Sequence, residues 1–157
     1  MRRKDREVTD FDKIIETLND CDRCCLGLVD KDGHAYIVPM NFGIETDGKK
    51  LALYFHCAPE GRKTDIIKSN PAVCFEADTA GKLVTGDPPC SYSYKYRCVM
   101  GEGKAEIISD KKEKSLGLNS IMNHYSEKSE REFPPEALEK VCVIKVEVSS
   151  YSCKEHI

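Results

Sequence analysis

Apolar and polar positions near the start of the chain alternate with the period of an α-helix. The apolar positions fall at i, i+3, i+4 and i+7, on one helical face: Phe11, Ile14, Ile15 and Leu18. Thr9 or Asp10 can cap this helix, because short polar side chains accept hydrogen bonds from the free N–H groups of a first turn. The pattern therefore predicts a helix that ends near residue 19 or 20.

Short apolar runs separated by turn residues follow, which is typical of antiparallel strands. The predicted strands are residues 24–29, 35–42, 51–57, 72–77, 94–108 and 141–148. The run 51–57 is too apolar for an exposed edge, and Gly101 and Gly103 predict a bend within 94–108. Most of these strands are joined by turns, so the sequence favours an antiparallel barrel over a βαβ series.

Two further helices interrupt the strands. Residues 61–69 predict a short helix stopped by Asn70-Pro71, and Asp110 with Glu113 predicts a capping box for a helix to about Tyr125. Residues 78–90 carry several glycines and prolines and predict a long loop, a lid or rim. Pro134-Pro135 predicts a turn before the last strand. At 157 residues, the whole chain (1–157) is expected to form one domain.

Composition excludes several classes of protein. The charged fraction of 32% and net charge of -3 indicate a globular chain without a polyanionic partner, and Asp5 and Glu7 interrupt the basic residues at the start. No apolar run has the length of a membrane span, and no apolar segment follows the basic start, so we expect a cytoplasmic location and no membrane contact. The nine cysteines should then be reduced.

The cysteine cluster Cys21-x-x-Cys24-Cys25 invites a zinc or redox interpretation. No second such pair follows, and the remaining candidates stand singly in strand patterns: His34, Cys57, Cys74, Cys90, Cys98 and Cys142. Core thiols explain them better, and we expect no metal site. The sequence also contains no nucleophile-elbow, Walker or Rossmann glycine motif, which leaves little support for a hydrolase or an NTPase.

Residues 54–63 form the most informative segment, in which a buried strand ends in His56 and Gly61 opens a helix. Free N–H groups at a helix start attract phosphate, and Arg62 and Lys63 would add positive charge. Taken alone, two basic residues after a glycine are usually just solvated. Pro39 interrupts an earlier strand pattern, which predicts either an ordinary edge strand or a place where a flat heterocycle lies.

Residues 92–97 interleave aromatic and basic side chains. This pattern suits stacking on nucleic acid, but it also describes a strand with alternating faces. The acidic overall balance and the lack of another basic stripe favour the strand, and we expect no nucleic-acid partner.

These segments resemble the pyridoxamine 5'-phosphate oxidase-like superfamily of FMN-binding split barrels, and within it the 5-nitroimidazole-resistance (Nim) group. The resemblance covers nearly the whole chain and is most specific in residues 53–63. It is supported by residues 1–7, 27–29, 36–43, 70–75 and 96–105. It implies a mainly β (α+β) fold: a six-stranded antiparallel split β-barrel with a few peripheral helices. It also implies a homodimer that binds two FMN molecules at its interface.

The resemblance assigns parts of a flavin site to individual residues. It places the isoalloxazine ring against Val38, Pro39, Met40, Asn41 and Phe42, and the ribityl phosphate near Phe55, His56, Gly61, Arg62 and Lys63. Tyr96 and Arg97 would reach the flavin from a later strand, either within the chain or from the other subunit. His56 would be the nearest residue to a catalytic group, or only a hydrogen-bond donor to the phosphate.

The resemblance implies an FMN-dependent oxidoreductase for small aromatic or nitro compounds, supplied with hydride by NAD(P)H or by a reductase. The alternative is a flavin-binding module that stores or senses FMN without turnover. The chain has no Trp and ends without the Arg/Pro/Trp segment of true pyridoxamine-phosphate oxidases, so vitamin B6 phosphate oxidation is not expected.

Overall fold

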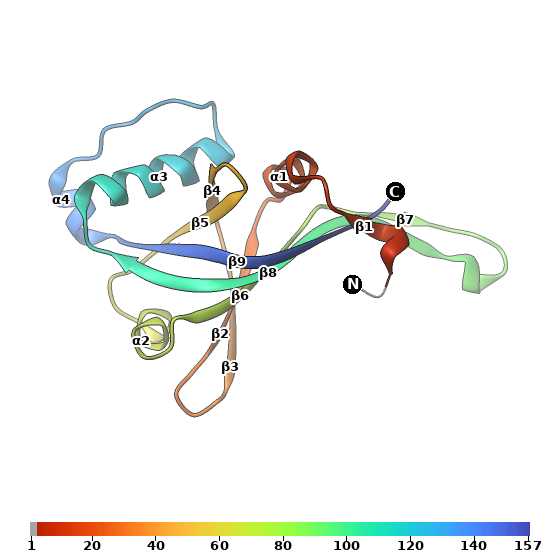
Figure 1. Ribbon diagram of the computed structural model, residues 1–157, viewed down its shortest axis with the longest axis horizontal. Helices are drawn as coiled ribbons and strands as arrows, with labels where there is room; N and C mark the ends of the chain where they lie inside the picture. The colour runs from red at the N-terminus through yellow and green to blue at the C-terminus, as the bar shows by residue number, and fades with distance from the viewer. Residues whose placement is uncertain (1–2) are drawn as a thin grey trace.

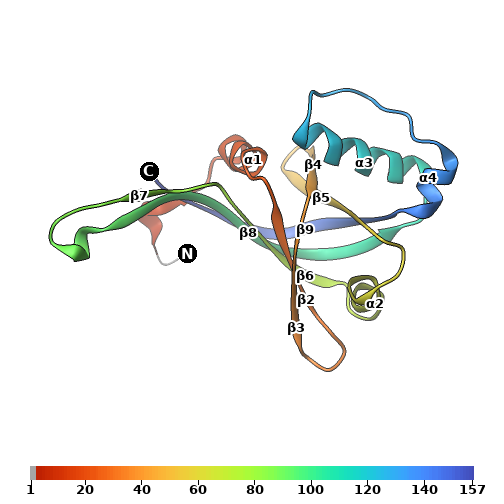
Figure 2. The same ribbon diagram turned by 180° about the vertical axis from the view of Figure 1, so that it is seen from behind.

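A computed structural model describes residues 3–157, which form a strongly curved antiparallel sheet with helices around it (Figures 1 and 2). The strands in this range are β1 (Glu7–Val8), β2 (Cys24–Val29), β3 (Ala35–Met40), β4 (Phe42–Asp47), β5 (Lys50–Cys57), β6 (Ala72–Asp78), β7 (Lys82–Val84), β8 (Ser93–Ile108) and β9 (Cys142–His156). The helices are α1 (Phe11–Asn19), α2 (Arg62–Ser69), α3 (Lys111–Tyr125) and α4 (Pro135–Lys140), with short 3-10 turns at Lys4–Arg6 and Pro89–Ser91. Of the basic start, Arg2 lies outside the described residues.

The order of the strands explains why the barrel is split. Hydrogen bonds link them in the order β3-β2-β6-β8-β9-β5-β4, always antiparallel, with β1 added to β9 and β7 to β8. The two ends of this series, β3 and β4, are consecutive in the chain and meet at Asn41. The chain itself therefore joins the two edges, while no ladder between β3 and β4 is formed in residues 3–157. The predicted split barrel is confirmed.

The single strand predicted over residues 35–42 is wrong, because the chain changes edges at Asn41. The N–H of Phe42 donates to the Tyr125 hydroxyl at 3.2 Å, and that hydroxyl donates to the Asp22 carbonyl at 3.0 Å. A side chain from α3 thus satisfies the backbone at the crossing point. The alternation of apolar residues continues through this point, so the sequence pattern did not reveal the break.

Three other predictions of local structure need correction. Residues 78–90 are not simply a loop, since β7 pairs with the start of β8 in an arm that projects from the barrel (Figures 1 and 2). The turn predicted at Pro134-Pro135 begins α4, as proline suits a first helical turn. The last strand runs to His156 instead of Val148, because its second half pairs with β8 and β1 although its sequence is largely polar.

Helix starts follow the predicted capping residues. Asp10 Oδ1 accepts from the N–H groups of Asp12 and Lys13, and α1 buries Ile14 and Leu18 against the sheet. At α3, Asp110 accepts from the Glu113 N–H at 2.9 Å. The reciprocal half of the predicted capping box is wrong, because the Glu113 carboxylate instead accepts from Lys145 Nζ at 2.9 Å.

Helix α3 packs closely on β4 at Gly43. A Cβ at this position would lie 2.4 Å from the Ile121 nitrogen, which is backbone and cannot rotate away. We expect Gly43→Ala to lower the free energy of unfolding by about 1–3 kcal/mol, the usual cost of overpacking. Urea denaturation measures this, and Glu45→Ala, exposed on the same strand, should change stability by less than about 0.5 kcal/mol. A Gly43→Ala variant as stable as the parent would contradict the close packing.

Candidate functional site

The start of α2 presents backbone N–H groups that have no capping side chain among residues 3–157. Gly61 precedes the helix with φ +146°, a conformation that other residues rarely adopt. The Thr64 hydroxyl donates to the Gly61 carbonyl at 2.8 Å and so does not cap the helix. A cavity of about 260 Å³ opens beside this turn, lined by Tyr36, Cys57, Ala58, Glu60, Gly61, Arg62, Lys63 and Thr64. Such a helix start is suited to binding an anion.

Lys63 adds a positive charge that lacks a counterion. Its side chain is half-buried, and its Nζ lies 3.2 Å from the sulfur of Met40, a weak acceptor. None of the ion pairs formed within residues 3–157 includes Lys63. A partly buried ammonium group is stabilised by an anion, so the charge and the uncapped helix start favour the same kind of ligand.

Arg62 is held against the β2–β3 hairpin. Its guanidinium carbon lies 4.4 Å from the centre of the Tyr36 ring, and Nη2 lies 3.6 Å from Asp30 Oδ2. The N–H of His34, which donates to Asp30, lowers the pKa of that carboxyl group and keeps it ionised beside Arg62. Sequence analysis missed both Asp30 and Tyr36. Tyr36 could have been found, since it shares a strand face with Val38 and Met40.

The predicted ring-binding segment meets α2 at one point. Met40 is buried at the end of β3 and contacts Lys63, while Val38 is half-buried, and Pro39 and Asn41 are exposed. The prediction that Pro39 marks an edge strand is confirmed, because β3 pairs only with β2 within the described chain. Met40 therefore brings the end of β3 beside the start of α2.

Phe42 and Phe55 lie in the core. They are directly opposed on β4 and β5, and both side chains are completely buried. These two side chains can therefore support a ligand site only from inside the barrel.

His56 is exposed and does not line the cavity that contains Arg62 and Lys63. Successive side chains of a strand point to opposite faces, and the next residue, Cys57, is the one that lines this cavity. The structure therefore does not bring the predicted catalytic histidine together with the two basic residues within one chain.

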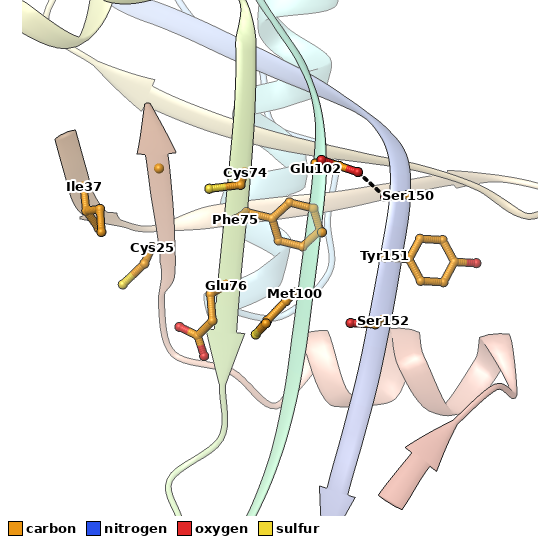
Figure 3. A pocket seen from close by; sticks show the side chains of 12 residues that line it. Cys25, Ile37, Cys74, Phe75, Glu76, Met100, Glu102, Ser150, Tyr151 and Ser152 are labelled. Carbon is orange, nitrogen blue, oxygen red and sulfur yellow. Dashed lines mark hydrogen bonds between the residues drawn. The ribbon is translucent and has the colours of Figure 1, made fainter. Parts of the chain in front are cut away.

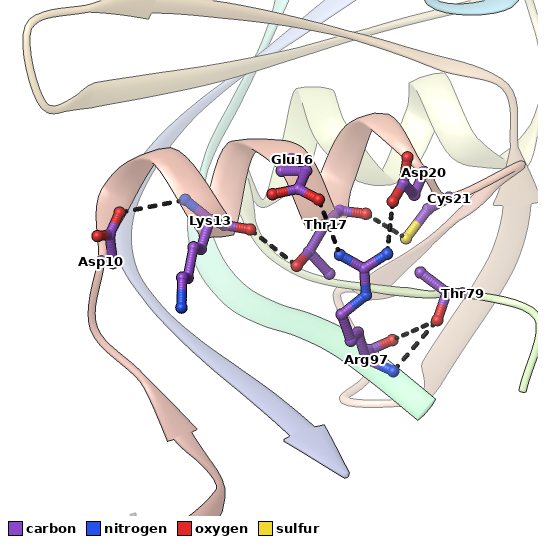
Figure 4. A network of polar contacts seen from close by, with 8 residues as sticks. All are labelled: Asp10, Lys13, Glu16, Thr17, Asp20, Cys21, Thr79 and Arg97. Atoms are coloured by element: carbon purple, nitrogen blue, oxygen red, sulfur yellow. Dashed lines mark hydrogen bonds and ion pairs between the residues drawn. The ribbon is translucent and has the colours of Figure 1, made fainter. Parts of the chain in front are cut away.

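Arg97 makes a separate network on β8 (Figure 4). Its guanidinium group pairs with Asp20, and Nη1 lies 3.5 Å from Glu16 Oε1, so it ties α1 to the sheet. The hydrogen bond to Asp20 raises the pKa of Arg97, which stays charged. Helices α1 and α2 lie on opposite sides of the β8–β9 ribbon in both views (Figures 1 and 2). Within one chain, Arg97 and the adjacent Tyr96 are thus apart from Arg62 and Lys63.

A second cavity, of about 430 Å³, lies on the outer face of the sheet (Figure 3). Its lining residues come from five strands: Cys25, Gly27, Ile37, Cys74, Phe75, Glu76, Met100, Gly101, Glu102, Ser150, Tyr151 and Ser152. Ile37 is 67% exposed and Met100 is 45% exposed. This face of the sheet is therefore both hollowed and apolar.

The sequence suggested that the cysteines are core thiols, but the structure buries only some of them. Cys21, Cys24, Cys142 and Cys153 are buried, but Cys74 and Cys90 are exposed and Cys57 lines the cavity at α2. Cys74 points outward because β6 alternates buried and exposed positions. The prediction is wrong for these exposed thiols.

Comparison with known proteins agrees with the split barrel. The family described as pyridoxamine 5'-phosphate oxidase matches residues 10–155. The chain belongs to this family. No curated protein sequence matches it.

Solved structures add nearer and more distant relatives. A candidate 5-nitroimidazole antibiotic resistance protein from Bacteroides thetaiotaomicron is 36% identical, with 95% of this chain and 86% of that chain covered and a TM-score of 0.82. The flavocytochrome Anf3 from Azotobacter vinelandii is 21% identical over 100% and 72% of the two chains, with a TM-score of 0.82. An FAD and heme binding protein from Mycobacterium smegmatis is 17% identical over 96% and 73%, with a TM-score of 0.81. The last two show the fold alone.

None of the helices in residues 3–157 combines the length and the apolar character needed to cross a membrane.

Proposed function

We propose that this chain binds FMN, with the flavin phosphate at the start of α2. The observation that carries this proposal is the half-buried Lys63 ammonium, unpaired within residues 3–157, beside N–H groups that no side chain there caps. A phosphate monoester matches both features, since it accepts several hydrogen bonds and carries negative charge. Arg62 can add a further charge-assisted hydrogen bond from its place over Tyr36.

In this proposal the isoalloxazine ring lies along the β3 edge from Val38 to Asn41. The exposed peptide groups of an edge strand can meet the polar end of the ring, and Val38 and Met40 can cover its face. A small barrel has its interior filled by side chains, so the ring lies outside it and needs a second wall. A second copy of the chain, docked through the apolar sheet face around Ile37 and Met100, would supply that wall.

A two-fold arrangement gives the separated residues a common role. Tyr96 and Arg97 are apart from α2 within one chain, but an isologous dimer can bring residues of one subunit to the site of the other, and the same contact then occurs twice. We infer a homodimer with two equal flavin sites, in which Tyr96 and Arg97 lie near the partner's flavin. His56, which is exposed on β5, would act on the flavin as a donor or as an acid.

The proposed activity is reduction of small aromatic or nitro compounds, with NAD(P)H as a transient electron donor. Bound FMN would supply the hydride or electron transfer, and the chain's residues would bind and orient it. The description of the Bacteroides relative as a nitroimidazole-resistance protein supports nitro compounds as one substrate class. The alternative is a flavin-binding module without turnover, which the exposed position of His56 outside the cavity favours.

Steady-state oxidation of NAD(P)H separates the two functions. With oxygen excluded, flavin-loaded protein is expected to oxidise NADH or NADPH over many turnovers only when a nitro or quinone acceptor from a panel is present. Protein from which the flavin has been removed is the control and should give no acceptor-dependent rate. No turnover with any donor and acceptor, by protein that holds its flavin, would reject the enzyme and leave the binding module.

A further inference from the structure

Cys57 and Cys142 are directly opposed on the neighbouring strands β5 and β9. They are the only two cysteines paired in this way in the strand registers of residues 3–157. Opposed residues of an antiparallel pair project to the same face, with Cα atoms about 4.5–5.5 Å apart. A disulfide spans Cα distances of about 4.4–6.8 Å. The Cα spacing of the two residues is therefore within the range that a disulfide spans.

The two thiols have unequal surroundings. Cys57 is half-buried and lines the cavity at the start of α2 together with Lys63, whereas Cys142 is 5% exposed and belongs to the hydrophobic core. A reagent dissolved in water can reach the first sulfur and not the second. Of the pair, Cys57 is thus the one open to attack.

The charge of the pair is also expected to reside on Cys57. Its interaction with the Cys142 thiol lowers the pKa of Cys57, and the nearby Lys63 ammonium lowers it further. The same interaction between the thiols, together with burial, raises the pKa of Cys142. Cys57 therefore carries the thiolate, which is the form of cysteine that reacts.

We propose that Cys57 and Cys142 form a redox-active pair, in which a hydroperoxide oxidises Cys57 and Cys142 converts the product into an intramolecular disulfide. The Cys57 thiolate attacks the peroxide, an S–O bond forms, and the O–O bond breaks. Sulfur loses two electrons, and the departing oxygen takes up a proton and leaves as an alcohol or water. The Cys142 sulfur then attacks Cys57, forming the S–S bond and breaking the S–O bond, while hydroxide takes the Cys142 proton and leaves as water.

This pair goes beyond the proposed flavin function and does not depend on it. It rests on strand register and on the surroundings of two cysteines, and it is tested on the purified full chain after flavin has been removed, because a phosphate bound beside Lys63 would shield Cys57.

The test is oxidation of the reduced chain by hydrogen peroxide, followed by tryptic digestion without reductant. Cleavage at the flanking basic residues releases Cys57 in peptide 51–62 and Cys142 in peptide 141–145. We expect these two peptides to be joined, with the mass of the pair lowered by two hydrogen atoms and the separate peptides restored by dithiothreitol. If peroxide leaves 51–62 and 141–145 unlinked while oxidising Cys74 or Cys90, the proposal is overturned.

Single variants assign the two roles and provide a control. Cys142→Ser should leave a sulfenic acid on Cys57 that dimedone labels, and Cys57→Ser should leave Cys142 as a free thiol. Cys90→Ser is the matched control, because this exposed thiol lies in the 3-10 turn Pro89–Ser91 and should not affect the linked peptides. Dimedone labelling of Cys142 instead of Cys57 would contradict the proposed order of attack.

Discussion

Replacing Arg62 and Lys63 together by alanine is expected to weaken FMN binding at least about 100-fold, or about 3 kcal/mol. Charge-assisted hydrogen bonds contribute about 1.5–3 kcal/mol each. Lys63 has no ion-pair partner within residues 3–157, so its hydrogen bond to the phosphate should contribute the full amount, about 1.5–3 kcal/mol, to FMN binding. Arg62 should contribute less, because it already contacts Asp30 at 3.6 Å. Quenching of flavin fluorescence on titration with protein measures the dissociation constants.

Two controls identify the phosphate as the group that is recognised. Riboflavin lacks the phosphate, so it should bind the parent chain far more weakly than FMN and be little affected by the double substitution. Lys68→Ala removes a charge at the other end of α2 and should leave FMN affinity unchanged. Equal affinities of the parent chain for FMN and riboflavin would show that the phosphate is not bound at the start of α2.

Ile37→Asp should convert the proposed dimer into a monomer and weaken flavin binding with it. Ile37 is 67% exposed on the outer sheet face, so the substitution costs the isolated chain little. In the dimer the carboxylate would be buried without a partner, and an unpaired buried charge costs several kcal/mol. Light scattering at micromolar concentration measures the oligomeric state, and fluorescence titration gives the flavin stoichiometry, expected as two FMN per parent dimer.

Leu116→Asp provides the matched control for the dimer. Leu116 is similarly apolar and 47% exposed, but it lies on α3 and does not line the sheet-face cavity. This variant should remain dimeric and retain its flavin. A parent chain that is saturated with FMN as a monomer would overturn both the dimer and the shared site.

Several elements could be predicted because local physics decides them. Strand β2 was predicted with the bounds observed, and helix α1 starts at its capping residue Asp10. The strand bend predicted at Gly101 and Gly103 is also confirmed, since a bulge occurs between Glu102 and Gly103. Alternation, capping groups and glycine all act over a few residues, which a sequence pattern can represent.

The elements that were missed depend on distant partners. The break at Asn41 is invisible locally, because the N–H of Phe42 is satisfied by Tyr125, more than eighty residues away. The second half of β9 is polar and forms a strand only because β8 and β1 pair with it. The glycines and prolines of residues 78–90 predicted a loop, yet Lys82–Val84 forms a strand that pairs with β8.

The candidate site divides in the same way. The glycine before Arg62 and Lys63, and the edge proline Pro39, are local signals, and the sequence by itself determined a helix that starts with two basic residues and an edge strand. Folding alone decided that Met40 meets Lys63, that Tyr36 and Asp30 hold Arg62, and that Arg97 is tied to α1. It also decided that Cys57 faces the cavity opposite Cys142. Spacing along a chain encodes the face of a strand or helix, whereas contacts between side chains arise only when strand register and helix packing bring remote segments together.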